Sequence, residues 1–122
     1  MPRYHNGDVV IVRFPFSEDH TQDKIRPGII LEEPFPSDAE NYLVCKITSS
    51  KPNSVYHPIV QPVKLDSKEG KTMGLLQDSY VVYNAIERLE VFLIIKKIGY
   101  CPFFKEILPF SRLARVLPLK HK

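Results

Sequence analysis

Proline is the residue that most constrains the fold of this chain. The sequence holds 11 prolines in 122 residues, about twice the ~5% of average proteins. A proline inside a helix removes a hydrogen bond and clashes with the preceding turn, so the count excludes a helical bundle. Short strands accept prolines at sheet edges and bends. Because a chain of this length can close one hydrophobic core, we expect a single mainly β domain over residues 1–122.

Several classes of protein are excluded by what the sequence lacks. Residues 1–8 are polar and do not show the basic and then apolar pattern of a signal peptide. The longest apolar runs are far below the ~18 residues of a membrane span. Cys45 and Cys101 are isolated, and the four histidines show no metal-ligand spacing. We therefore expect a cytoplasmic protein with reduced, packed cysteines, no metal, no other cofactor and no membrane contact.

The pattern of β-forming residues predicts a small barrel or sandwich with an appended helix. The proline-containing segment 56–65 is expected at a sheet edge, Asn84 at a bulge or bend, and residues 66–74 in a turn-rich connection. After Gly99, Pro102 suits the first turn of a helix, and Pro109 predicts a kink in it or two short helices in its place. The other strands are expected at residues 9–14, 25–31, 42–47, 79–89 and 91–98.

The net charge of +3 is too small to identify a nucleic-acid binder by itself. Its distribution is uneven, because residues 92–122 carry seven Lys or Arg and one Glu, a net +6. This basic third is either a solvated helix face or an electrostatic contact for RNA or an acidic partner.

Five segments of the chain follow one another in a specific order. The first, GDVVIVRFPF at 7–16, is followed ten residues later by Arg-Pro-Gly-Ile-Ile at 26–30. Thr48 and Ser49 close the next strand. Gly74-Leu75 with Ser79-Tyr80-Val81 then leads into IIKKIG at 94–99. Together these segments resemble the MazF/PemK (Kid) family of bacterial toxin endoribonucleases. The resemblance covers roughly residues 5–100, and its most specific part is the first segment with its Arg-Pro step.

The resemblance implies a partly open SH3-like barrel with a C-terminal helix, working as a homodimer. It also implies the toxin of a type II toxin-antitoxin system, which cleaves single-stranded mRNA without metal through attack by the ribose 2′-hydroxyl. The implied partner is an antitoxin protein with a disordered, often acidic tail.

Arg26 and Thr48 are the first candidates for catalysis. A fixed guanidinium offers paired donors to the negative charge that builds on a pentavalent phosphate, and Pro27 holds the backbone of Arg26 extended. The Thr48 hydroxyl and the N–H groups of Thr48, Ser49 and Ser50 can hold a phosphate oxygen. The structural alternatives are a surface arginine paired with a carboxylate and a threonine that satisfies its own turn.

His20 is the third catalytic candidate. It lies six residues before Arg26, where the Kid-like branch has a histidine, and an imidazole with an ordinary pKa near ~6.5 can transfer protons. Glu18, Asp19 and Asp23 in the same loop are alternative bases. Phe16 and Asn84 are candidates for contacting RNA bases, by stacking and by hydrogen bonding respectively.

The late strand departs from the family pattern. Where Kid-like relatives carry Arg-x-Asp, this chain has Val82 and Asn84, so a catalytic acid/base pair is missing or relocated there. A catalytically inactive SH3-like module that binds RNA or protein therefore stays open as an alternative. A CcdB-like gyrase inhibitor fits less well, because the chain has no tryptophan at its C-terminal end.

Overall fold

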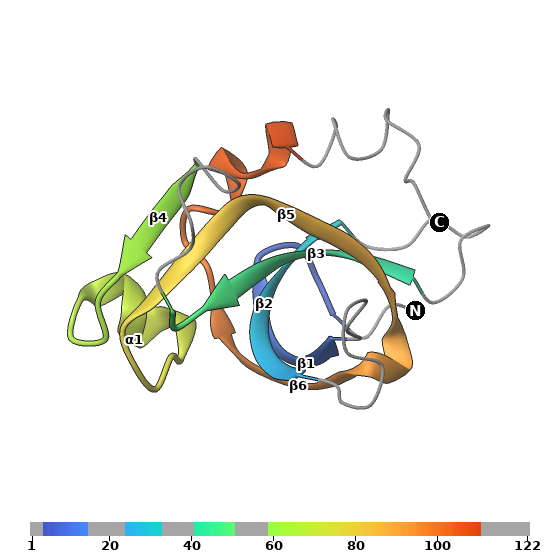
Figure 1. The fold of residues 1–122 in the computed structure, drawn as a ribbon, viewed down its shortest axis with the longest axis horizontal. Helices are drawn as coiled ribbons and strands as arrows, with labels where there is room; N and C mark the ends of the chain where they lie inside the picture. The colour runs from blue at the N-terminus through green and yellow to red at the C-terminus, as the bar shows by residue number, and fades with distance from the viewer. Residues whose placement is uncertain (1–3, 15–23, 33–40, 51–58, 111–122) are drawn as a thin grey trace.

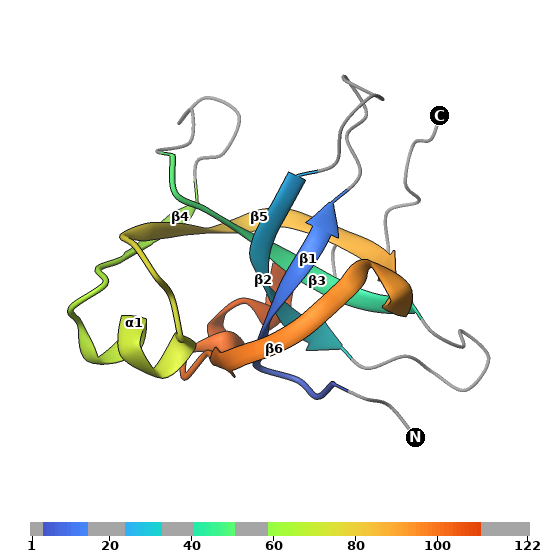
Figure 2. The same cartoon turned by 90° about the horizontal axis from the view of Figure 1, so that it is seen from below.

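The computed structural model describes residues 4–14, 24–32, 41–50 and 59–110. In this part of the chain, six strands form one antiparallel sheet in the order β4-β5-β3-β2-β1-β6. The strands are β1 (Asp8–Phe14), β2 (Lys24–Glu32), β3 (Asn41–Thr48), β4 (Val60–Val63), β5 (Ser79–Glu90) and β6 (Ile94–Tyr100). Figures 1 and 2 show the sheet curling around itself. Because β4 and β6 remain separate edges, the barrel is partly open, which confirms the expected fold class.

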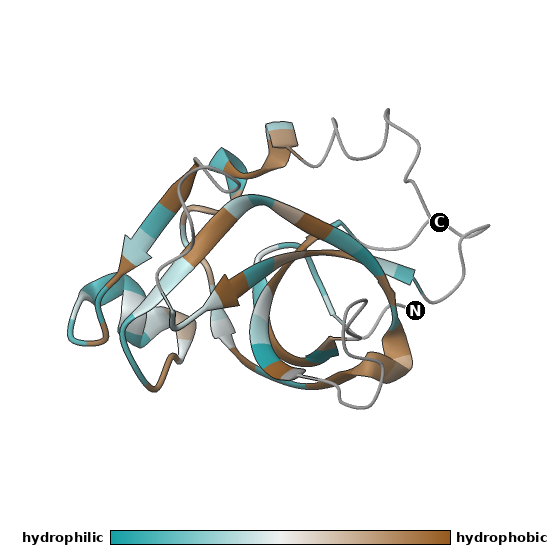
Figure 3. Ribbon diagram, in the orientation of Figure 1, coloured by the Kyte–Doolittle hydropathy of each residue, from teal (hydrophilic) through white to brown (hydrophobic). Residues whose placement is uncertain are grey.

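The central strands bury both of their faces, which explains their nearly continuous apolar sequences. Successive side chains of a strand point to opposite faces, and Val9 and Val10 accordingly belong to two different hydrophobic clusters. The inner cluster, enclosed by the curl, holds Val10, Val12, Phe14, Ile30, Tyr42, Val44, Leu89 and Ile94. The outer cluster includes Val9, Ile29, Cys45, Ile47, Met73, Val81 and Cys101. In Figure 3 the hydrophobic segments follow the curving strands, whereas α1 is mostly hydrophilic.

A proline in the middle of the sheet explains where one backbone ladder stops. Strand β2 pairs with β1 from Lys24 onward, but its pairing with β3 starts only at Gly28. Pro27, directly before Gly28, has no N–H to donate. The β2–β3 contact on the other side of this proline is made by side chains, and this is where the candidate site lies.

The segment after β4 contains a helix where a turn-rich connection was expected. Helix α1 (Lys68–Met73) has only six residues, and Ser67 caps its start by accepting from the N–H of Gly70 at 3.0 Å. Gly74 ends it in the left-handed conformation. Its brevity and its internal Gly70 leave little helical periodicity in the sequence.

Near the C-terminus one expectation needs correction, and the expectation of two short helical pieces is confirmed. The last strand begins at Ile94 and not at Val91, because Val91–Leu93 form a 3-10 turn, η2. The helix expected from Pro102 onward is, over the described residues, a 3-10 turn, η3 (Phe104–Glu106), followed by helical residues 108–110. Residues 111–122, with much of the basic third, lie outside the described part.

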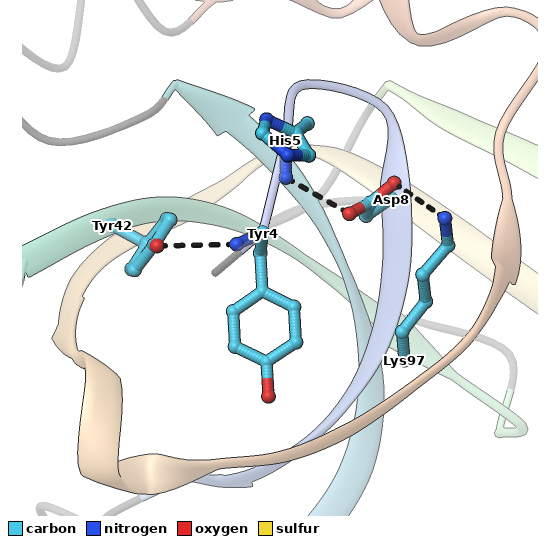
Figure 4. Close-up of polar contacts among 5 residues, drawn as sticks. All are labelled: Tyr4, His5, Asp8, Tyr42 and Lys97. Carbon is cyan, nitrogen blue, oxygen red and sulfur yellow. Dashed lines mark hydrogen bonds and ion pairs between the residues drawn. The ribbon is translucent and has the colours of Figure 1, made fainter. Parts of the chain in front are cut away.

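A buried carboxylate anchors the start of β1. Asp8 is only 4% exposed, and its Oδ2 accepts a hydrogen bond from the His5 N–H at 2.9 Å. Its Oδ1 lies 3.2 Å from the ammonium of Lys97 on β6. Nearby, the Tyr4 N–H donates to the Tyr42 hydroxyl at 3.3 Å, as Figure 4 shows. These contacts tie the N-terminal segment to β3 and β6.

None of the helices in the described ranges combines the length and apolar character that a membrane crossing requires. Both cysteines are buried and free of disulfide bonds.

Candidate functional site

Arg26 and Thr48, the two leading candidates, are in direct contact. The Arg26 Nη1 donates a hydrogen bond of 2.7 Å to the Thr48 Oγ1. The register of β2 and β3 pairs Gly28 with Lys46, and two further residues along each strand this places Arg26 opposite Thr48. Both side chains are half-buried, so the guanidinium is held against the end of β3 while part of it reaches solvent.

The Thr48 hydroxyl is oriented by two donors. Besides the guanidinium of Arg26, the backbone N–H of Ser50 donates to Oγ1 at 3.2 Å. A hydroxyl has two acceptor lone pairs and one hydrogen, so with both lone pairs engaged its O–H points away from these partners. The turn that satisfies Thr48 therefore also prepares its O–H to donate to an anion. Of the two interpretations left open by the sequence, the threonine that satisfies its own turn is observed directly.

The pair lies where the inner face of the sheet changes from apolar to polar. On β3 the inner-face residues run from Tyr42 and Val44 in the inner cluster to Lys46 and Thr48 at the strand end. Across the sheet, Thr48 is paired with Tyr80 of β5, and Arg26 with Val12 of β1. The site thus combines hydrogen-bond donors and cations at the end of β3, where the strand is still paired with β5.

Lys46 is a charged member of this face that was not predicted from the sequence. Its ammonium lies 3.5 Å from Glu87 Oε2 and 5.3 Å from the centre of the Phe14 ring. The period-two alternation of β3, which puts Lys46 on the same face as Thr48, was the signal that could have identified it.

Asn84 belongs to a bulge in β5, as expected. Between Cys45 and Ile47 the partner on β5 changes from Ile86 to Val81, so two steps on β3 correspond to five on β5. Asn84 is exposed within this bulge, whereas Tyr80 is the residue paired with Thr48.

A buried thiol stabilises the bulge. The Cys45 Sγ donates to the backbone carbonyl of Val82 at 3.2 Å, inside the core. Burial, and secondarily the nearby Cys101, raise the pKa of the Cys45 thiol. Burial is also the main cause that raises the pKa of Cys101 to about 12. Because nucleophilic cysteines need a lowered pKa and access to solvent, these thiols have a structural role.

A cavity of about 590 Å³ opens on the other face of the sheet. Its floor includes Ile11, Pro27 and Ile47, which alternate with the inner-face residues. Leu76, 91% exposed, and Lys96 lie in its walls. Arg26 lines this cavity as well, so it contributes to both faces of the sheet.

The remaining candidates are placed as follows. Ser49 and Ser50 are exposed directly after Thr48. His20, Phe16 and the loop carboxylates Glu18, Asp19 and Asp23 lie outside the described residues. Within the described ranges, no group of three or more His, Cys, Asp or Glu side chains is arranged to hold a metal ion.

Comparison with known families identifies the class of protein. A family described as PemK-like, MazF-like toxin of type II toxin-antitoxin system matches residues 5–103. The chain therefore belongs to this toxin family. A comparison with curated proteins gives no match.

Two of the solved structures that share the fold illustrate the similarity. One is the Mycobacterium tuberculosis toxin MazF-mt6, which is 20% identical, with 92% of this chain and 99% of that chain covered and a TM-score of 0.56. The other is described as an endoribonuclease in complex with its cognate antitoxin from Mycobacterial species. It is 14% identical, with 96% and 99% covered and a TM-score of 0.57.

Proposed function

We propose that this protein, over residues 1–122, is an endoribonuclease toxin that cleaves single-stranded mRNA in the cytoplasm. The observation that carries the proposal is the 2.7 Å hydrogen bond between Arg26 and Thr48 at an open strand end. Membership of the MazF/PemK family supports the same activity, as does a structural relative that is itself described as an endoribonuclease.

The proposed reaction uses the substrate's own nucleophile. The 2′-oxygen of the ribose attacks the adjacent phosphorus while its proton passes to a base, and the P–O5′ bond breaks as the 5′-oxygen takes up a proton. The products are a 2′,3′-cyclic phosphate and a 5′-hydroxyl. Arg26 uses one N–H on Thr48 and keeps others for the phosphorane oxygens. The oriented O–H of Thr48 donates to the same group. His20, or a carboxylate of its loop, is the proposed proton carrier.

Ser49, Ser50, Phe16 and Asn84 are proposed to contact the substrate. Ser49 and Ser50 are exposed beside Thr48, which suits contact with the phosphate backbone. Asn84 is exposed on the β5 bulge, where its amide can hydrogen-bond to a base. Phe16 is proposed to stack on a base.

Replacing Arg26 tests the proposal most directly. We expect Arg26→Ala to lower kcat/KM on an unstructured RNA by about 10²–10³, the usual effect of removing one transition-state donor. Arg26→Lys should recover little, because an ammonium lacks the planar fork. Cleavage is followed in EDTA by mapping the 5′ ends of the products, with Arg13→Ala as the matched control on the adjacent strand. An Arg26→Ala protein as fast as the wild type would refute the assignment.

Thr48 provides a second, independent test. Thr48→Val keeps the branched shape but removes the hydroxyl that contacts Arg26, so we expect at least tenfold slower cleavage. Because Arg26 and Ser50 can turn to solvent at this half-buried site, the protein should stay folded, with a loss in the free energy of unfolding of about 1 kcal/mol. Thr48→Ser keeps the hydroxyl and should retain most of the activity. Equal activity of the valine and serine variants would show that the hydroxyl has no part in the reaction.

One observation favours a second candidate function, an inactive relative that binds RNA or protein. Val82, which stands at a catalytic position of Kid-like relatives, is 4% exposed and has an apolar side chain. The same cleavage assay separates the candidates, because an inactive relative binds RNA without producing new 5′ ends.

The proposed protein partners are an antitoxin and a second copy of the chain. Family membership supports the antitoxin, and the second structural relative was solved with its own cognate antitoxin.

Large apolar side chains such as Leu76 and Phe92, 91% and 73% exposed, suit protein contacts. Sedimentation equilibrium should give twice the 14.1 kDa of one chain, and a monomer at micromolar concentration would contradict the homodimer.

A further inference from the structure

Lys46 lies beside the proposed catalytic pair without being part of it. It precedes Thr48 by two residues on the same face of β3, so their backbone positions are about 7 Å apart. Arg26, on the neighbouring strand, is opposite Thr48. The polar end of the inner face therefore carries two cations. One is Arg26, in contact with Thr48, and the other is Lys46, two residues before Thr48 on the same strand.

The packing under Lys46 holds its ammonium in place. The Phe14 ring is buried, 2% exposed, and the ammonium lies 5.3 Å from its centre. Gly28, paired with Lys46 across the β2–β3 ladder, provides the room. A Cβ on Gly28 would come within 2.6 Å of Val44 Cγ1 and 3.4 Å of the Phe14 ring. The ammonium of Lys46 therefore lies over the face of a buried aromatic ring, where a cation–π contact helps to hold it.

The charge of Lys46 is shared with one carboxylate, Glu87 of β5, at 3.5 Å. The side chains of the two residues are 35% and 42% exposed, and an ion pair this exposed stabilises the fold little. A phosphate diester approaching from solvent can therefore take the place of the carboxylate on the ammonium. Glu87 in turn repels that phosphate.

We infer that Lys46 is a second phosphate contact, which binds a neighbouring nucleotide's phosphate when Arg26 and Thr48 hold the scissile one, and that Glu87 competes with the RNA for it. The inference rests on the proposed function, since it takes single-stranded RNA as the ligand. A single-stranded backbone carries one negative charge per nucleotide, so a cation one strand repeat from the scissile phosphate meets an adjacent charge. Lys46 positions the strand and takes no part in the bond-making step.

Binding is tested with a 2′-O-methyl single-stranded RNA, which cannot undergo 2′-hydroxyl attack, by fluorescence anisotropy at several salt concentrations. Lys46→Ala should weaken binding about tenfold and reduce the slope of log Kd against log salt by about 0.7. Lys46→Arg should restore both. Lys68→Ala, which removes an exposed lysine of α1 outside the basic third, is the matched control and should change binding little.

Glu87→Gln distinguishes a phosphate contact from a purely structural role of Lys46, because a structural role would not make RNA affinity depend on Glu87. Removing the competing carboxylate should tighten RNA binding severalfold, and the gain should vanish in the Lys46→Ala, Glu87→Gln double variant. The inference is overturned if Lys46→Ala behaves like Lys68→Ala, or if the gain from Glu87→Gln persists without Lys46.

Failure of the second phosphate contact can be distinguished from failure of the proposed function. If the wild type cleaves RNA in an Arg26-dependent way but Lys46 changes neither affinity nor salt slope, only the second phosphate contact fails. If Lys46-dependent binding is found without any cleavage, the proposed reaction fails and the contact stands.

Discussion

At the scale of single residues, several buried or half-buried polar side chains in the described part of the chain have clear hydrogen-bond or ion-pair partners. Thr48 engages both hydroxyl lone pairs, the Cys45 thiol donates to a bulge carbonyl, and Asp8 binds an N–H and an ammonium. An unpaired buried polar group would cost the full desolvation penalty of about 1–3 kcal/mol. Each of these residues avoids that cost with a partner from a distant segment of the sequence: Arg26 for Thr48, Val82 for Cys45 and Lys97 for Asp8.

Asp8 allows the hydrogen bond and the ion pair to be measured separately. Asp8→Ala removes both and leaves the His5 N–H without its acceptor, so we expect a loss of about 2–3 kcal/mol in the free energy of unfolding. Asp8→Asn keeps an acceptor oxygen and loses only the charge that faces the half-exposed Lys97, so about 1 kcal/mol is expected. Urea denaturation measures both values. Equal losses in the two variants would show that the ion pair dominates.

At the scale of elements, short pieces are held by close backbone contacts more than by their own propensity. Helix α1, with six residues, is too short to be stable alone, and it lies beside the end of β6 (Figure 2). Gly74 closes it with a φ of 73°, and a Cβ there would clash with the backbone carbonyl of Ile98 on β6.

Gly74→Ala should therefore be costly in two ways. The left-handed conformation disfavours any side chain by about 1–2 kcal/mol, and the clash forces α1 away from β6, so we expect a total loss of about 3 kcal/mol. Lys71→Ala, an exposed change in the same helix, should stay within about 0.5 kcal/mol. Thermal and urea unfolding compare the two variants. Similar stability of both would show that α1 moves freely on the sheet.

At the scale of the whole molecule, the outer cluster holds titratable groups that must stay neutral. Burial raises the pKa of Cys101 to about 12 and that of Tyr83 also to about 12, the latter with help from Glu106. Burial raises the pKa of Cys45 as well. A raised pKa keeps the native state protonated while the unfolded chain ionises, so the stability is complete below about pH 9 and is lost as the pH rises.

We expect the free energy of unfolding, measured in reductant, to be flat from pH 7 to about 9. Above that it should fall by up to about 1.4 kcal/mol per pH unit for each thiol. In a Cys45→Ser, Cys101→Ser protein the fall should start nearer pH 10, where Tyr83 takes over. If the double variant loses stability at the same pH as the wild type, other groups cause the alkaline transition.

The sequence alone was enough to predict a mainly β chain, because its prolines and alternating apolar segments are local properties. It also pointed to Arg26, which the Arg-Pro step marks, and to Thr48 at the end of a strand. It did not reveal α1, whose six residues depend on contacts with β6, or Lys46, whose significance comes from the register of β2, β3 and β5. Register and the bulge at residues 82–85 decide which side chains meet, because a shift of one residue moves every side chain to the other face. Only the folded sheet therefore brought Arg26, Thr48, Lys46 and Glu87 to the polar end of one face.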